Sequence, residues 1–217
     1  RFCCIRKESY HVKMDRQAQF RAREALIFQI AEQLLLENGE AGMTLDALAA
    51  ELDLAKGTLY KHFQSKDELI VQVLIAYETE LAAIMAEAAK SDDIHQLIQA
   101  YFVFRLATPE KHLLFERLEN KLAATRRTLR PYFARLYFIR KSYLRQALPF
   151  VKQHLHEHNS TMTSRDYLSA GWALVQGTAA ILHSSFYQRY LGDREGLLAA
   201  MLDTLHSLAL RSSSDHS

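Results

Sequence analysis

Apolar residues recur every three or four positions along most of the chain, rather than every second position. This spacing places them on one face of a helix and predicts an all-α protein. A first helix spans about residues 21–38, and it ends at Gly39, a residue that favours the left-handed conformation of a helix C-terminus.

Three more helices are predicted directly after this one. Thr44 begins a helix of about nine residues, because its hydroxyl can accept a free backbone N–H. Residues 53–55 form a turn, and residues 56–63 form a third short helix. Ser65, three residues before a glutamate, forms a capping box that opens a fourth helix, which continues to about Ala88.

Two short helices joined by a tight turn suit reading of the DNA major groove, because the first helix braces the second, projecting one. At 100° per residue, Leu59 and Phe63 share the inward face of the third short helix. No acidic residue occurs between Leu54 and Lys66, which suits a polyanionic partner better than the net charge of +2 suggests. The pattern predicts a helix-turn-helix.

The segment TLDALAAELDLAKGTLYKHFQSKDEL, residues 44–69, resembles the DNA-binding signature of the TetR (tetracycline repressor-like) family of transcriptional regulators. The resemblance implies a three-helix DNA-binding domain over residues 20–66 and a larger helical domain for dimerisation and ligand binding over residues 67–211. It implies phosphate contacts from Thr44, Tyr60, His62 and Lys66, and positions close to the base edges for Lys56, Gly57, Thr58 and Lys61. Each of these side chains would otherwise be an ordinary surface or half-buried residue.

Two residues depart from the family pattern. Asp53 stands where the family often has Gly, and the turn should survive because Asp tolerates the left-handed conformation better than most residues. Ala55 replaces a common Ser or Thr, which removes a hydroxyl that could cap the third helix or contact a phosphate.

Capping residues and prolines divide the remainder into further helices. Those predicted are one from Ser91 or Asp92 to Arg105, one beginning at Thr108-Pro109, residues 128–157 with Pro131 and Pro149, a helix from Thr163 to about Tyr190, and one from Asp193 or Arg194 to about Arg211.

The last two long helices carry small and apolar residues, and the resemblance implies a homodimer in which they form a four-helix bundle. Ordinary packing within one chain is the alternative. The candidate interface residues are Gly171, Leu174, Gly177, Ile181, Leu198, Met201 and Leu205.

An aromatic and histidine set marks the candidate effector pocket, although core packing is the commoner role for such residues. Its members are Tyr101, Phe102, Phe104, His112, Phe115, Trp172, His183 and Phe186. Residues 117–145 add nine Lys and Arg residues against a single acid, Glu119. A solvated helix face, an anionic effector and electrostatic attraction of DNA all explain such a segment.

The sequence predicts a transcriptional regulator, namely a repressor that a small-molecule effector releases from a palindromic double-stranded operator. A helical ligand-binding protein or enzyme with a vestigial head is the alternative. No catalytic residues, cofactor or metal site are predicted, and the i, i+4 pair His154 and His158 is interpreted as an exposed helix end. Cys3 and Cys4 offer no metal-ligand spacing.

No apolar run approaches the roughly 20 residues of a membrane span, and no secretory signal is found, so a cytoplasmic protein without membrane partners is expected. Met14 is a candidate native start. Residues 1–19 are expected to form a poorly ordered extension, and residues 212–217 a C-terminal tail.

Overall fold

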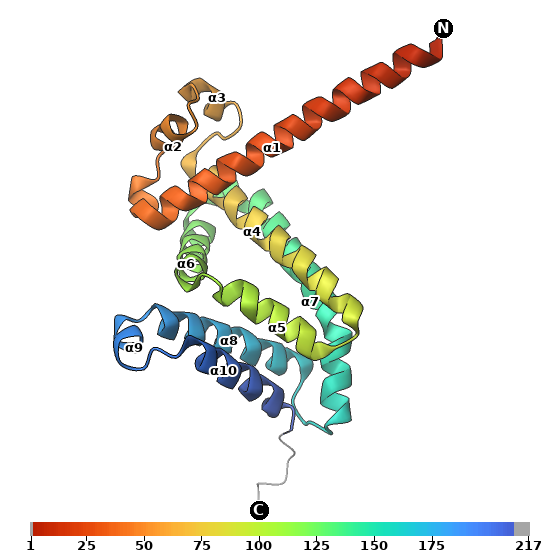
Figure 1. The fold of residues 1–217 in the computed structure, drawn as a ribbon, viewed down its shortest axis with the longest axis vertical. Coiled ribbons are helices and arrows are strands. Elements are labelled where there is room, and N and C mark those ends of the chain that lie inside the picture. Colours follow the sequence, from red (N-terminus) through yellow and green to blue (C-terminus); the bar gives the residue numbers. More distant parts are fainter. Residues whose placement is uncertain (1, 211–217) are drawn as a thin grey trace, which may run out of the picture. The chain divides into compact units, whose positions relative to one another are not determined.

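The computed structural model describes the backbone of residues 2–210 and the side chains of residues 19–210. This part of the chain contains ten α-helices, two short 3-10 helices and no strand (Figure 1), which confirms the all-α prediction. The chain divides into two compact units, Arg1–Val73 and Leu74–Ser217. The boundary between these units therefore falls seven residues after residue 66, where the sequence placed the end of the DNA-binding domain.

The N-terminal unit begins with α1, Phe2–Gly42, whose helical conformation breaks at Gly39, where φ is 67°. The predicted role of this glycine at a helix C-terminus is thus confirmed. The helix begins far before residue 21, as no Gly or Pro precedes Gly39. Most of the predicted extension, 1–19, lies outside the residues with described side chains, and the predicted tail, 212–217, lies outside the described backbone.

Helices α2, Leu45–Glu51, and α3, Lys56–Tyr60, follow as a compact pair. The hydroxyl of Thr44 accepts the backbone N–H of Ala47 at 3.0 Å, which is the predicted cap of α2. The turn survives its unusual residue, since Asp53 adopts a left-handed conformation with φ of 50°. Ala55 occupies the N-cap position of α3, and its side chain makes no capping hydrogen bond there.

Helix α3 ends at Tyr60, three residues earlier than predicted, and the chain continues as a turn. Leu59 and Phe63 are 0% and 1% exposed, which confirms that they share the inward side. Lys61 keeps a helical backbone, and the N–H of Phe63 still donates to the carbonyl of Leu59 at 2.9 Å, so the turn continues the local geometry of α3.

Helix α4, Lys66–Ala88, begins with the predicted capping residues. The backbone N–H of Glu68 donates to Ser65 Oγ at 3.1 Å, and the Glu68 carboxylate accepts the N–H of Gln64 at 3.0 Å rather than that of Ser65. The segment Lys66–Ser91 is long and apolar enough to cross a membrane, but more than half of its most apolar stretch is buried, as in the core helix of a folded domain.

The C-terminal unit consists of the second part of α4 and the helices that follow it. These are η1 Ala89–Ser91, α5 Ile94–Leu106, α6 Pro109–Thr125, η2 Arg127–Leu129, α7 Arg130–Glu157, α8 Ser164–His183, α9 Ser185–Tyr190 and α10 Arg194–Leu208.

Three predicted boundaries in this unit were wrong. Asp93, rather than Ser91 or Asp92, caps α5, because Asp92 is left-handed with φ of 54° and cannot begin a helix. Helix α8 ends at His183 instead of running to Tyr190, since Ser184 is extended and its hydroxyl starts α9. The last helix ends at Leu208, before residue 211.

The predicted starts of α6 and α8 are confirmed, at Pro109 and after Thr163. Pro131 lies in the first turn of α7, where its missing N–H needs no partner, whereas Pro149 lies inside α7 without ending it. The main core of the unit joins α5, α7, α8 and α10, and Figure 1 shows α8 between α5 and α10.

Candidate DNA-binding surface and ligand cavity

The eight residues of the predicted DNA-binding set all lie in the N-terminal unit, and none is buried. Thr58, His62 and Lys66 are half-buried, and the other five are exposed, including Tyr60 at 49%. These polar side chains can therefore contact the phosphates of DNA without any unfolding of the protein.

Three of the four predicted phosphate-contact residues line one surface hollow of about 410 Å³, namely Thr44, Tyr60 and Lys66. The Lys66 ammonium also donates to the backbone carbonyl of Glu40, which fixes its position beside the hollow. The hollow thus combines a hydroxyl, a phenol and a positive charge, which are donors that proteins use to bind phosphates, whereas the carboxylate of Asp46, which also lines it, opposes an anion.

His62, the fourth predicted phosphate contact, does not line this hollow. Its imidazole lies against the ring of Phe20, with ring centroids 5.1 Å apart, and against Phe63 at 6.1 Å. The structure therefore places His62 on a separate, aromatic part of the same unit.

Lys56 forms an ion pair with Asp46, with Nζ and Oδ1 2.6 Å apart. This hydrogen bond raises the pKa of Lys56. Asp46 lies before the stretch without acidic residues, Leu54 to Lys66, on which the prediction of a polyanionic partner was based. The neutralisation of the Lys56 charge was therefore not predicted. Part of the positive charge predicted for the base edges is therefore neutralised by α2.

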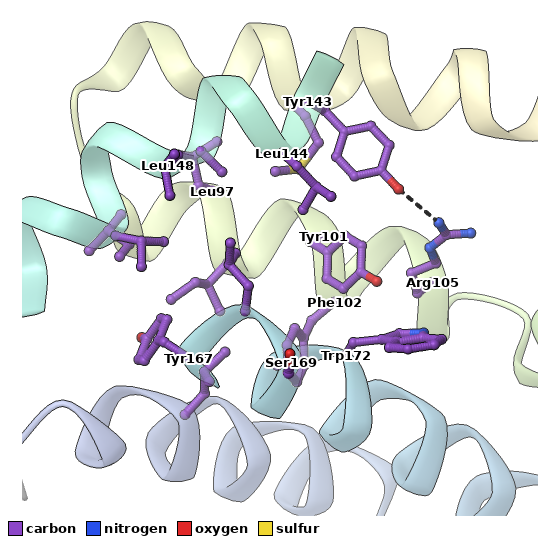
Figure 2. A pocket seen from close by; sticks show the side chains of 18 of the residues that line it. Leu97, Tyr101, Phe102, Arg105, Tyr143, Leu144, Leu148, Tyr167, Ser169 and Trp172 are labelled. Atoms are coloured by element: carbon purple, nitrogen blue, oxygen red, sulfur yellow. Dashed lines mark hydrogen bonds between the residues drawn. The ribbon is translucent and has the colours of Figure 1, made fainter. Parts of the chain in front are cut away.

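The C-terminal unit contains a cavity of about 570 Å³ with mostly apolar walls from α5, α7 and α8 (Figure 2). Three members of the predicted effector set line it: Tyr101, Phe102 and Trp172. Arg105 and Arg140 reach it as well, and Arg140 belongs to the basic segment, residues 117–145.

The other five members of the predicted set lie elsewhere. Phe104 and Phe115 pack against Tyr77, with ring centroids 4.8 and 5.2 Å apart. His112 is buried, and burial, aided by the nearby Arg105 charge, lowers its pKa to about 4. His183 and Phe186 are exposed. Helical spacing marks an aromatic residue as inward-facing but does not separate a core wall from a cavity wall.

A buried network of charges adjoins the cavity. Nη2 of Arg105 lies 2.8 and 3.0 Å from the two carboxylate oxygens of Glu78, which also accepts the Tyr143 hydroxyl at 3.1 Å. Arg140 donates to Glu78 at 2.9 Å and to both oxygens of Glu119, at 2.8 and 2.6 Å. The sequence analysis missed this network apart from Arg140 and Glu119, because Glu78 and Arg105 lie 27 residues apart.

The network keeps its charges because its members compensate one another. Burial alone would raise the pKa of Glu78, but the charges of Arg105 and Arg140 outweigh burial and lower it. Burial raises the pKa of Glu119, and Arg140 opposes this only in part. The guanidinium groups of Arg105 and Arg140 thus reach the cavity with their charges already paired, whereas Arg165, which also lines the cavity, is exposed to water.

The remaining basic residues of 117–145 are all exposed. Most of that segment is therefore a solvated helix surface, and Arg140 alone among its nine cations lines the cavity.

The candidate dimer residues divide into two groups. Gly171 and Leu205 are buried against each other within one chain, since a Cβ on Gly171 would lie 3.2 Å from Leu205 Cδ2. Leu174, Leu198 and Met201 pack against the same core. Gly177 and Ile181 are exposed on α8, and nothing lies within 4 Å of a Cβ placed on Gly177. Gly177 and Ile181 are thus the exposed members of the set, whereas Leu174, Leu198 and Met201 are half-buried.

Comparisons of sequence agree with the architecture of the N-terminal unit. Residues 27–73 match the family model for bacterial regulatory proteins of the tetR family. The HTH-type transcriptional regulator Rv1816 of Mycobacterium tuberculosis is 28% identical over 98 residues, which cover 42% of each chain. The HTH-type transcriptional repressor Rv3405c of the same organism is 30% identical over 77 residues, 36% of this chain and 41% of that protein. The chain therefore spans about two fifths of the length of these relatives.

Solved structures extend the likeness of fold to most of the chain. A bacterial regulatory protein of the tetR family from Rhodococcus RHA1 has a TM-score of 0.67 at 16% identity, covering 88% of this chain and 98% of that one. Regulatory protein SCO4313 has a TM-score of 0.62 at 19% identity, with 87% and 97% covered. Residues 27–73 thus match the tetR family of bacterial regulatory proteins, and most of the chain shares the fold of these two solved regulatory proteins.

Proposed function

We propose that this chain is a DNA-binding transcription regulator that represses genes from a palindromic operator and is released by a small-molecule effector. The observation that carries the proposal is the hollow formed by Thr44, Tyr60 and Lys66 within a helix-turn-helix of the tetR family. Its donors are exposed or half-exposed, and they suit a phosphate of the DNA backbone.

Sequence preference in this proposal comes from α3 and the turn that follows it. Gly57 and Thr58 lie in α3, and Lys61 is exposed just after it, so these residues can approach the major-groove edges of the bases. Substitutions of Thr58 or Lys61 should change which sequences bind best. Substitutions of Lys66 should weaken all sequences alike, because phosphate contacts position the protein without specifying bases.

A homodimer is part of the proposal, because one helix-turn-helix binds only half of a palindromic site and the two recognition helices must lie about 34 Å, or a multiple of this, apart. The outer face of α8 with Gly177 and Ile181 supports a symmetric contact, since both residues are exposed and a glycine permits close approach. Gly171 and Leu205 are already engaged within the chain and contribute only by supporting this face.

The effector in this proposal occupies the cavity of about 570 Å³ in the C-terminal unit. The apolar walls favour a mainly apolar molecule, and the paired charges of Arg105 and Arg140 favour a neutral polar group over a free carboxylate. If such a ligand lowers the affinity for DNA by some factor, DNA must lower the affinity for the ligand by the same factor.

Regulation of transcription also implies a cytoplasmic protein whose work is binding rather than catalysis. The alternative, a ligand-binding helical protein or enzyme with a vestigial head, predicts only weak and unspecific DNA affinity. The two functions therefore separate in a DNA-binding experiment.

The experiment is footprinting of the full chain on DNA from the neighbourhood of its own gene, followed by affinity measurements on the protected fragment at several salt concentrations. We expect a two-fold related site with strong salt dependence, and a large loss of affinity in the double variant Tyr60→Ala, His62→Ala. Lys90→Ala is the control, since Lys90 is an exposed lysine of the C-terminal unit. Unchanged affinity in the folded double variant would refute the proposed DNA-binding surface.

A further inference from the structure

Four histidines from three helices meet at one end of the C-terminal unit. His95 lies in the first turn of α5, His154 in the last turn of α7, and His206 in the last turn of α10, while His158 caps α7. Ring centroids are 4.0 Å apart for His95 and His206, 4.6 Å for His154 and His158, 6.2 Å for His95 and His154, and 6.4 Å for His154 and His206. Helices far apart in sequence thus bring one kind of side chain to one place.

These side chains have unused ligand atoms. His154 is 5% exposed, and within the described part of the chain Nε2 of His154 and Nε2 of His206 are buried without a hydrogen-bond partner. Nδ1 of His158 lies 2.8 Å from the backbone carbonyl of His154, so this nitrogen carries the proton and leaves Nε2 of His158 with a free lone pair. An imidazole oriented through its other nitrogen is the arrangement common among metal ligands.

Burial and neighbouring groups act on two of the four imidazoles. Burial lowers the pKa of His154, and the neighbouring His158 and His95 lower it further. Burial, His95 and His154 likewise lower the pKa of His206. The carboxylates of Asp93 and Asp203 act on His206 in the opposite direction and supply negative charge that a cation would favour.

The spacing suits a shared ion. Two imidazoles bound to one tetrahedral zinc, with Zn–N distances of about 2.0–2.1 Å, have ring centroids about 5 Å apart. The observed separations lie on both sides of that value. In the described residues no three such side chains already surround a common point, so binding requires the imidazoles to turn about their side-chain bonds. His95 is exposed and can turn in this way, whereas His158 is exposed but held through its Nδ1.

We propose that His95, His154 and His206 bind a divalent transition metal ion such as Zn²⁺, with His158 beside His154 as the fourth ligand. The ion joins the start of α5 to the ends of α7 and α10. It also acts next to the cavity, because the ring of Tyr167 lines the cavity and lies 5.7 Å from the ring of His154. The site is independent of the proposed binding of DNA.

The test uses the full chain with Cys3→Ser and Cys4→Ser, which removes the thiols as competing ligands. After treatment with a chelator and dialysis, Co²⁺ is added at neutral pH and its visible absorption is recorded, and Zn²⁺ is then titrated in competition. We expect one ion per chain, the intense visible bands of tetrahedral Co²⁺, displacement of Co²⁺ by Zn²⁺, and a higher melting temperature with the ion bound.

His95→Ala and His206→Ala should each weaken Zn²⁺ binding by at least roughly 10-fold, the lower end of losses seen even for residues that only support metal ligands. His95 is exposed, so its variant should fold normally. His156→Ala is the matched control, because His156 is an exposed histidine of α7 outside the cluster. The proposal is overturned if the chain does not bind Co²⁺ with tetrahedral bands, or if His95→Ala and His206→Ala bind Zn²⁺ as tightly as His156→Ala.

Discussion

The Glu78 carboxylate of α4 is 1% exposed and is bound by Nη2 of Arg105 from α5, at 2.8 and 3.0 Å from its two oxygens. The two opposite charges are thus buried together, and each compensates the cost of removing the other from water. Arg105 also lines the cavity, so an interaction inside the core adjoins the place where a ligand is proposed to bind.

Arg105→Met should lower the free energy of unfolding by roughly 3–5 kcal/mol, because it removes one partner and leaves Glu78 buried with reduced compensation. Glu78→Gln together with Arg105→Met should recover part of that loss, since no uncompensated carboxylate then remains. Urea unfolding followed by circular dichroism measures both.

Lys90→Met provides the control for this pair. Lys90 and Glu87 also form an ion pair, at 2.6 Å, but their side chains are 71% and 74% exposed. We expect a loss below about 1 kcal/mol, as for most surface pairs. Similar losses for Arg105→Met and Lys90→Met would contradict the importance assigned to the buried pair.

Local chemistry made much of the N-terminal unit predictable. Thr44 caps the residues directly after it, Gly39 and Asp53 adopt the left-handed conformations expected of them, and the inward pair Leu59 and Phe63 follows from helical spacing. Each of these features depends on residues within about one helical turn, which is the range over which sequence patterns act.

The C-terminal sites were less predictable, because they depend on which inward faces meet. Periodicity placed Phe104 and Phe115 inward, yet they pack on Tyr77 instead of lining the cavity. The break at Ser184 was not predicted because no Gly or Pro marks it, and only the extended serine separates α8 from α9. Pairs between helices, such as Glu78 with Arg105, carry no signal in a single sequence.

His112 should make stability depend on pH. Its pKa is lowered to about 4 in the folded chain by burial and by the charge of Arg105, against about 6.5 when unfolded. The folded state therefore disfavours the proton. The stabilisation is complete above pH 6.5 and is lost as the pH falls from 6.5 through 4, with a change of up to about 3 kcal/mol.

His112→Gln removes this titration. The difference in free energy of unfolding between the native chain and the variant, measured in urea from pH 7 to pH 4, should change by about 3 kcal/mol in favour of the variant. Parallel pH profiles for the two proteins would show that His112 does not remain neutral in the fold.

Asp46→Asn should strengthen DNA binding. The carboxylate of Asp46 pairs with Lys56 at 2.6 Å, and its removal frees Lys56 for a phosphate while also removing a repulsive charge. The plot of the logarithm of the binding constant against that of salt concentration should steepen by about 0.9, the value for one phosphate contact. Glu51→Gln is the control, an exposed acid of the same helix, α2. Equal slopes for the two variants would argue against this role of Asp46.

Gly177→Asp should dissociate the proposed homodimer. Nothing lies within 4 Å of a Cβ at this exposed position, so the aspartate creates no clash within the chain and acts only on a partner. A symmetric interface would contain two such aspartates, one from each chain, so the unfavourable burial of a charge would occur twice. Sedimentation velocity should show monomers with unchanged helical content. A stable dimer of Gly177→Asp would place the interface away from this face of α8.

Trp172 should report ligand binding directly. It is the single tryptophan of the chain, it is 54% exposed, and it lines the cavity, so an apolar ligand should remove water from the indole and shift its emission to shorter wavelength.

The same fluorescence change can compare ligands of different charge. Decanol, decanoate and decylamine share one chain length and differ in charge. We expect decanol to bind most tightly, because Glu78 and Glu119 already compensate Arg105 and Arg140, and the third lining arginine, Arg165, is exposed to water that screens its charge. Ser169→Phe, at an exposed lining position, should block binding, whereas Ser207→Phe on α10 should not. Tighter binding of decanoate than of decanol would show that a lining arginine, either Arg165 or one of the two paired with glutamates, binds the carboxylate.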